Sequence, residues 1–191
     1  DVLFLGDSLA YCGFMPLELW DTYGIPGFVC SSLAEKTFEI KVQPLTQEAF
    51  APFGKVLTID GLEPAGGNPA SHYWYPQVTV VDAPTSINLM PIVPRPFTIQ
   101  NFEAHDHTAE NLIPMDGPVI VAVAKKGELK EDNVAAFLVP QGVGVSIDAQ
   151  VWHFVPFPLG KKTMCSVIFA SGTSSNDIYF KDLPDALGLE L

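Results

Sequence analysis

The chain has 191 residues, which is enough for one well-packed core or for one domain with an appendage. Hydrophobic residues make up 48% of it and charged residues 17%, a balance that indicates a globular protein and excludes a disordered one. The net charge of −12 argues against nucleic acids and anionic membranes as partners, because both attract positive charge.

The cysteines and the apolar stretches bear on the location of the protein. Three cysteines, Cys12, Cys30 and Cys165, occur without CxxC spacing and do not indicate a disulfide scaffold. The first residues lack the basic region of a signal peptide, and no apolar run approaches the roughly 20 residues that a membrane span needs. We therefore predict a cytoplasmic protein. Its 17 prolines and 15 glycines favour β architecture over a helical bundle.

Residues 1–35 differ in pattern from the rest of the chain. The run Val2-Leu3-Phe4-Leu5 predicts a buried strand, Gly6-Asp7-Ser8-Leu9 a sharp turn, and residues 10–20 a helix. This arrangement resembles the first block of SGNH (GDSL-type) esterases, with Ser8 as the nucleophile. The Gly-x-Asn-Asp and Asp-x-x-His blocks of that family do not occur in the chain. We therefore predict an appendage or an esterase-like fragment at 1–35 and a main domain at 36–191.

The main domain opens with a predicted strand at 36–42 and a short helix at 44–54. Thr46 is suited to cap the start of this helix and Gly54 to follow its end. A second strand is predicted at 55–59, followed by a mobile loop at 61–71 that is rich in proline and glycine.

An aromatic stretch and a series of short strands follow. The stretch His72-Tyr73-Trp74-Tyr75 predicts either a loop that contacts a ligand or a surface cluster of aromatic side chains. Short strands separated by Pro, Gly, Asn or Asp indicate a sandwich or a barrel. The last residues, from 176 onwards, are acidic and weakly periodic, and predict a short helix or a flexible end. The strands are predicted at 78–81, 87–92, 97–103, 111–114, 118–124, 135–139, 143–147, 153–157 and 163–170.

The segment His105-Asp106-His107-Thr108-Ala109-Glu110 has the donor groups of a metal site. Side chains two positions apart in a strand point to the same face, so His105 and His107 are expected to project together. Glu110 adds a carboxylate nearby. Nitrogen and oxygen donors of this kind suit Zn, Mn, Fe or Ni. The alternative is a set of exposed polar residues in a loop before the next strand.

A second segment completes this site. The turn Pro140-Gln141-Gly142 leads into a strand, and Val151-Trp152-His153 follows. Together with His105, His107 and Glu110, the late His153 resembles the ligand set of the cupin superfamily. The resemblance implies a mainly β, cupin-like double-stranded β-helix (a jelly-roll barrel) that brings distant segments together. The spacing between His107 and Glu110 is shorter than in most cupins.

Several motifs in order along residues 38–180 resemble the ureidoglycolate lyases, formerly called hydrolases. They are Leu45-Thr46-Gln47-Glu48-Ala49-Phe50-Ala51-Pro52-Phe53-Gly54-Lys55-Val56, Glu103-Ala104-His105, Leu112-Ile113-Pro114-Met115, Gln141-Gly142-Val143, Val151-Trp152-His153, Phe157-Pro158-Leu159 and Asn176-Asp177. The resemblance implies a small-molecule substrate, cleavage of ureidoglycolate to glyoxylate and urea in purine or allantoin catabolism, and a homodimer. This chain has Glu110 where the family usually has Gln and Ala104 where it usually has Arg.

We assign the expected roles as follows. His105, His107, Glu110 and His153 are the predicted metal ligands, and Glu103, His105 and His153 the predicted catalytic residues. Arg95, Trp152 and Tyr73 are the predicted substrate-binding residues. A small α-hydroxy acid needs a cationic group for its carboxylate, and Arg95 (the only arginine), one of the lysines or the metal itself is expected to supply it. The alternatives are a metal-binding cupin with other chemistry, such as sugar isomerisation, and a cupin that binds a ligand without catalysis.

Overall fold

The structure, a computed structural model, describes residues 38–73, 77–78 and 83–191. The predicted appendage at 1–35, with Ser8, lies outside the described residues, as does most of the strand predicted at 78–81. Residues Phe38–Leu191 form a unit of their own. Among the described residues, no helix combines the length and the apolar character needed to cross a membrane.

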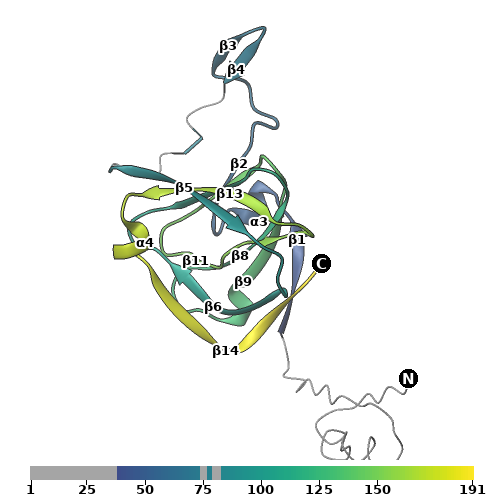
Figure 1. The fold of residues 1–191 in the computed structure, drawn as a ribbon, viewed down its shortest axis with the longest axis vertical. Helices are drawn as coiled ribbons and strands as arrows, with labels where there is room; N and C mark the ends of the chain where they lie inside the picture. Colours follow the sequence, from purple (N-terminus) through teal and green to yellow (C-terminus); the bar gives the residue numbers. More distant parts are fainter. Residues whose placement is uncertain (1–37, 74–76, 79–82) are drawn as a thin grey trace, which may run out of the picture. The chain divides into compact units, whose positions relative to one another are not determined.

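Strands make up most of the described chain, so the predicted mainly β, cupin-like fold is confirmed (Figure 1). The helical segments are short. In chain order the elements are β1 (Phe38–Pro44), α3 (Gln47–Phe50), β2 (Gly54–Leu57), β3 (Gly66–Asn68), β4 (Ser71–Tyr73), β5 (Thr85–Ile92), β6 (Thr98–Ala104), β7 (Glu110–Pro114), β8 (Val119–Ala124), η1 (Glu131–Asn133), β9 (Val134–Val139), β10 (Gly144–Ile147), β11 (Trp152–His153), β12 (Phe157–Pro158), β13 (Thr163–Ala170), α4 (Thr173–Asn176) and β14 (Tyr179–Glu190).

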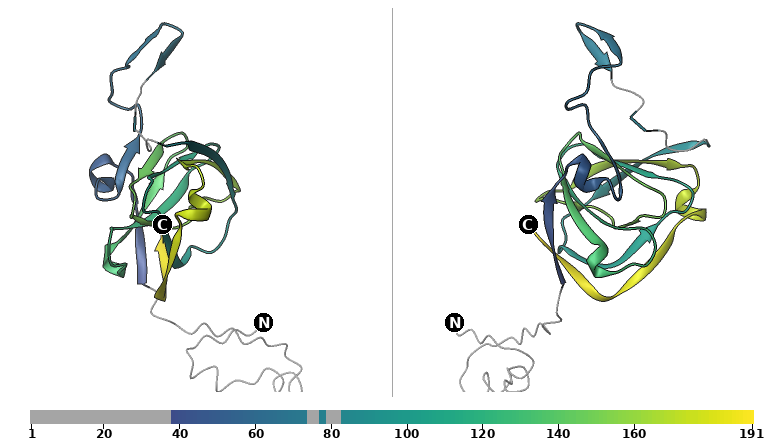
Figure 2. Two further views of the ribbon diagram at one scale, coloured as in Figure 1. Left: turned by 90° about the vertical axis from the view of Figure 1, so that its left-hand side faces the viewer. Right: turned by 180° about the vertical axis from the view of Figure 1, so that it is seen from behind.

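Two larger sheets build the domain (Figures 1 and 2). The first has the order β11-β6-β14-β1-β9-β8-β12, and an additional pairing of β11 with β8 closes six of these strands into a ring. The second is antiparallel and has the order β2-β10-β7-β13-β5. The small pair β3–β4 stands as a third sheet.

Strand β8 is buried on both faces, as its uninterrupted apolar sequence predicts. Val119, Val121 and Val123 pack into a core cluster shared with side chains of the second sheet. The alternate residues Ile120 and Ala124 pack into a second cluster built from the strands of the ring. The domain therefore has one core inside the ring and another between the ring and the second sheet.

Helix α3 and the segment after it close one side of the core between the sheets. The Thr46 side chain accepts a hydrogen bond from the backbone N–H of Ala49 at 3.1 Å, which confirms Thr46 as the N-cap. Phe50 is fully buried and packs edge-on against Phe137. The helix is shorter than predicted, because it ends at Phe50 and Gly54 opens strand β2 instead.

Replacing Gly54 with alanine is expected to destabilise the fold strongly. Gly54 has φ +149°, and a Cβ atom there would overlap the backbone carbonyl oxygen of Ser146 on the paired strand β10. Overpacking of this kind typically costs about 1–3 kcal/mol, and the unfavourable backbone conformation adds to it. Thermal or denaturant unfolding of Gly54→Ala measures the loss.

Gly142 offers a matched control for this substitution. It also has a positive φ, +78°, but a Cβ atom there would meet nothing within 4 Å. Gly142→Ala should therefore show only the backbone cost, roughly 1–2 kcal/mol. Equal losses of stability in the two variants would mean that the close approach to Ser146 is not the reason why Gly54 is glycine.

Three predicted features are wrong. Residues 179–190 form strand β14, which pairs with β1 and β6, and not a helix or a flexible end. The loop predicted at 61–71 includes β3 and the start of its partner β4. The single strand predicted at 153–157 is two short strands, β11 and β12, which pair with different parts of β8.

Candidate metal centre

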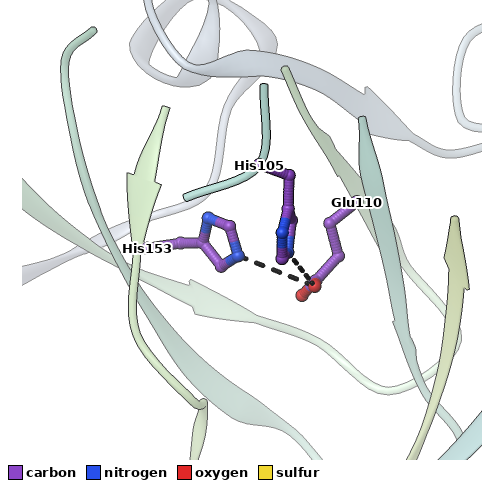
Figure 3. Close-up of side chains that lie close together, drawn as sticks. All are labelled: His105, Glu110 and His153. Atoms are coloured by element: carbon purple, nitrogen blue, oxygen red, sulfur yellow. Dashed lines mark hydrogen bonds and ion pairs between the residues drawn. The ribbon is translucent and has the colours of Figure 1, made fainter. Parts of the chain in front are cut away.

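Three separate segments bring His105, Glu110 and His153 to one place between the two sheets (Figure 3). His153 lies on β11, where it pairs with Glu103 of β6 and Val123 of β8. Glu110 is the first residue of β7 in the second sheet. His105 follows directly after the end of β6.

The three side chains are buried and close together. The Nε2 atom of His105 lies 3.4 Å from Oε2 of Glu110, and the Nε2 atom of His153 lies 3.6 Å from the same oxygen. The two imidazole rings have centroids 5.0 Å apart. Each residue offers one donor atom within 4.8 Å of the others.

Hydrogen bonds to backbone carbonyls orient both imidazoles. Nδ1 of His105 donates to the carbonyl of Asp177 at 2.7 Å, and Nδ1 of His153 donates to the carbonyl of Val151 at 3.0 Å. A carbonyl oxygen only accepts, so the proton of each neutral ring resides on Nδ1 and the lone pair of Nε2 points toward Glu110. This is the usual arrangement around metal-bound histidines.

The donor set fits a cation between the rings and the carboxylate. A neutral Nε2 and a carboxylate oxygen are both acceptors, so they face each other favourably only when a proton or a metal ion lies between them. Nε2 of His153 is buried and has no hydrogen-bond partner. Two ligands about 2.0–2.2 Å from a tetrahedral zinc ion lie roughly 3.3–3.6 Å apart. The separations of 3.4 and 3.6 Å match that spacing.

The electrostatics of the site keep Glu110 ionised. Burial raises the pKa of the Glu110 carboxyl, but the attraction to His153 and His105 outweighs burial and lowers the pKa to about 2. Burial lowers the pKa of His153, but Glu110 and Glu103 outweigh it and raise the pKa to about 9. Without a metal, Glu110 is therefore ionised and His153 is protonated at neutral pH, and a bound cation would replace the Nε2 proton of His153.

Glu103 stands beside this group as a second carboxylate. Its Oε1 atom lies 3.8 Å from Nε2 of His153, and its side chain is 17% exposed. Burial raises the pKa of Glu103, and the negative charge of Glu110 raises it further, against the opposing effect of the two histidines. A carboxylate with a raised pKa at the edge of a cation site is suited to exchange protons with a bound substrate.

His107 does not join the cluster, and the expectation that it shares a strand with His105 is wrong. Strand β6 ends at Ala104, so the pleated alternation stops before His105. The His107 side chain is 84% exposed, and its Nδ1 atom lies 3.0 Å from Oδ1 of Asp177. Among the described residues, the potential metal ligands gather only around His105, Glu110 and His153.

Arg95 packs beside the ring core. Its guanidinium donates to the carbonyl of Val155 at 2.6 Å and lies over the ring of Phe157, 4.1 Å from the ring centroid. Within the described ranges, no arginine or lysine forms an ion pair with Glu103 or Glu110.

Trp152 and His153 point to opposite faces of β11, as successive residues of a strand do. The indole N–H of Trp152 donates to the carbonyl of Gly127 at 2.9 Å, and the ring packs edge-on against Tyr179 in the core of the ring. The backbone of Tyr73 lies in β4, and its side chain is outside the described part of the chain.

One residue of this site was missed by the sequence interpretation. Asp177 accepts the Nδ1–H of His105 through its carbonyl and two backbone N–H groups of the 105–107 turn through its carboxylate. The motif Asn176-Asp177 was part of the family resemblance, but nothing in the local sequence connects it to residues some 70 positions earlier.

A cupin-like β fold with two buried imidazoles and a carboxylate defines the class: a protein with a small-molecule site that is suited to a metal ion. The sequence matches the ureidoglycolate lyase family over residues 37–185, and the chain belongs to this family. It is homologous to ureidoglycolate lyases, which are enzymes of the lyase class.

Individual relatives agree with the family assignment. The chain is 29% identical over 158 residues to a ureidoglycolate lyase of Burkholderia mallei, which covers 78% of this chain and 92% of the relative. It is 30% identical over 154 residues to that of Pseudomonas syringae pv. tomato, covering 75% and 91%. It is 32% identical over 146 residues to that of Pseudomonas paraeruginosa, covering 72% and 86%.

Proposed function

We propose that the protein is a metal-assisted lyase that cleaves ureidoglycolate to glyoxylate and urea. The observation that carries this proposal is the buried convergence of His105, Glu110 and His153 in a member of the ureidoglycolate lyase family. The homodimer implied by the resemblance stays a prediction.

His105, Glu110 and His153 are the residues that would hold the metal, as Zn, Mn, Fe or Ni. When bound, a divalent ion supplies Lewis-acid polarisation of the substrate oxygens. The two carbonyl-bound Nδ1 atoms keep both imidazoles aimed at the ion position. Burial of all three side chains excludes water from this side of the site, which strengthens each electrostatic interaction.

Glu103 is placed to move the proton. The reaction needs a base to remove the hydroxyl proton of ureidoglycolate, so that the hydroxyl carbon becomes the aldehyde carbon of glyoxylate as its bond to nitrogen breaks. The departing nitrogen must gain a proton to leave as urea. Glu103 accepts the first proton and returns it to the nitrogen, so that atoms and charge balance. Its raised pKa suits both directions of transfer.

The substrate carboxylate needs a positive partner. The contacts of Arg95 with Val155 and Phe157 favour the metal and not Arg95 for this role. A metal held by His105, Glu110 and His153 would supply the positive charge that the substrate carboxylate needs.

An assay of glyoxylate release tests the proposal. The purified protein is loaded in turn with each of the four metals, mixed with ureidoglycolate, and compared with a chelator-treated sample. Release well above the spontaneous rate is expected in at least one loaded sample and not in the treated one. Release at the spontaneous rate in every sample would reject the substrate assignment.

The position of Arg95 also favours a second candidate, a metal cupin that acts on another small molecule. In the described part of the chain, no lysine or arginine side chain forms an ion pair with Glu103 or Glu110. Only the family resemblance therefore points to ureidoglycolate as the substrate. A protein with one equivalent of metal that is inactive on ureidoglycolate would favour this candidate. A metal-free protein that still binds ligand would favour a purely binding role.

A further inference from the structure

Asp177 holds the turn that carries His105. Its carboxylate accepts the backbone N–H of Asp106 at 2.9 Å and the backbone N–H of His107 at 3.0 Å. Its backbone carbonyl accepts the Nδ1–H of His105 at 2.7 Å, across 72 positions of sequence. One residue therefore fixes both the backbone of the turn and the imidazole ring.

His105 needs such support because no strand fixes its side chain. It lies between the end of β6 at Ala104 and the start of β7 at Glu110. Its carbonyl accepts the N–H of Gln150 at 2.6 Å, which holds the peptide but not the ring. The His105 ring is held by its bond to Asp177, by the contact of Nε2 with Glu110 and by packing against Phe169 and His153.

Asp177 is itself firmly placed. Its backbone N–H donates to the carbonyl of Thr173 at the start of α4, at 2.9 Å. Two residues later, Tyr179 begins β14 and pairs with Ala104, the last residue of β6. The hydroxyl of Tyr179 also donates to Oδ1 of Asp106, at 3.0 Å. The C-terminal segment and the 105–107 turn are therefore joined at several points.

We propose that Asp177 is a positioning residue for the metal site, which fixes the tautomer and the direction of His105 so that Nε2 faces Glu110. The proposal rests on the metal site of the proposed function but not on the identity of the substrate. Partners of metal-bound histidines typically change metal affinity by about 10–100-fold when they are lost. An effect of that size is expected here.

Two substitutions grade the loss of the carboxylate. Asp177→Ala removes both acceptors for the N–H groups of Asp106 and His107, and so frees the turn. Asp177→Asn keeps one oxygen, but its amide N–H₂ group faces the other N–H, so an intermediate effect is expected. The backbone carbonyl that binds His105 is present in both variants, and only its position changes.

His107→Ala is the matched control. It removes the bond between the imidazole of His107 and Asp177 but leaves both backbone N–H bonds to the carboxylate, from Asp106 and His107. Because the His107 side chain is exposed, the variant should fold normally. Its metal affinity should stay within about threefold of the wild-type value if the backbone bonds are what positions His105.

Two readouts separate positioning from general loss of structure. The affinity for Co²⁺ is measured by competition with a chelator, without substrate. In the metal-free protein, proton–nitrogen NMR of the imidazoles reports whether the Nδ1–H of His105 remains protected from exchange. Asp177→Ala is expected to lower Co²⁺ affinity by about 10–100-fold and to lose the protected Nδ1–H signal, with Asp177→Asn in between.

Each result of these measurements either supports or overturns the role of Asp177. Wild-type Co²⁺ affinity and a retained Nδ1–H signal in Asp177→Ala would overturn the proposal, as would an equal loss in His107→Ala. If the wild-type protein bound no Co²⁺, the proposed metal site would fail, and the NMR signal alone would still decide whether Asp177 orients His105.

Discussion

Glu110→Gln is expected to lower the affinity for a divalent metal by roughly a hundredfold or more, since even the outer partners of metal ligands change it by about 10–100-fold. The substitution keeps the shape of the side chain and removes its charge. That charge lies 3.4 and 3.6 Å from the two imidazole nitrogens and is the negative charge that a bound cation would face. Ureidoglycolate cleavage should fall with metal occupancy.

Elemental analysis and the glyoxylate assay measure this effect on the same preparation. The family usually has glutamine at this position, so the variant also tests whether metal binding by this chain depends on the carboxylate. Full metal content together with full activity in Glu110→Gln would contradict the role given to Glu110. Excess metal that restores activity would show that the loss is one of affinity and not of fold.

Glu103→Gln is expected to lower kcat by about 10²–10⁴-fold, the usual contribution of a general base, while metal content stays unchanged. Glu103 lies 3.8 Å from Nε2 of His153, but it is not among the three clustered ligands. Its carboxylate has a raised pKa, which glutamine cannot reproduce. Steady-state kinetics and metal analysis of one preparation separate proton transfer from metal binding.

Glu128→Gln is a control for this variant. Glu128 is an exposed carboxylate whose partner in the structure is Lys130, at 3.0 Å, and its loss should leave both kcat and metal content unchanged. A Glu103→Gln protein with normal kcat would remove Glu103 from the mechanism. A parallel loss of metal would make Glu103 a ligand and not a base.

Local sequence pattern predicts a segment well when the segment is buried along its whole length or when its contacts are with residues near it in the sequence. Strand β8 lies between two cores, and its unbroken apolar run reports that directly. Thr46 caps α3 through a bond to a residue three positions away, which is a local matter. Both were predicted from the sequence.

Strand β14 shows where local pattern fails. Its sequence contains Pro184 and Gly188, which disfavour a strand. The structure accommodates Pro184 in a break of register between Asp182 and Leu187, where no bonds to β6 are required of it. Pairing with β1 at residues 187–190 and with β6 at residues 179–182 and 187–188 outweighs the weak local preference, and neither partner is near in sequence.

The residues of the candidate metal centre also fall into those that the sequence predicted and those that it did not. The residue types and their order along the chain predicted that His105, Glu110 and His153 belong to one site, and the structure brings them together. The place of His107 could not be predicted, because it depends on β6 ending at Ala104. Asp177 was not recognised because its contacts with the turn span 70 to 72 positions.

The most direct test of the account is a crystal structure of metal-loaded protein with anomalous diffraction data collected at the absorption edge of the ion. The account predicts one strong anomalous peak about 2.0–2.2 Å from Nε2 of His105, Nε2 of His153 and a carboxylate oxygen of Glu110. A protein that is saturated with metal in solution but has no peak between these three side chains would contradict it.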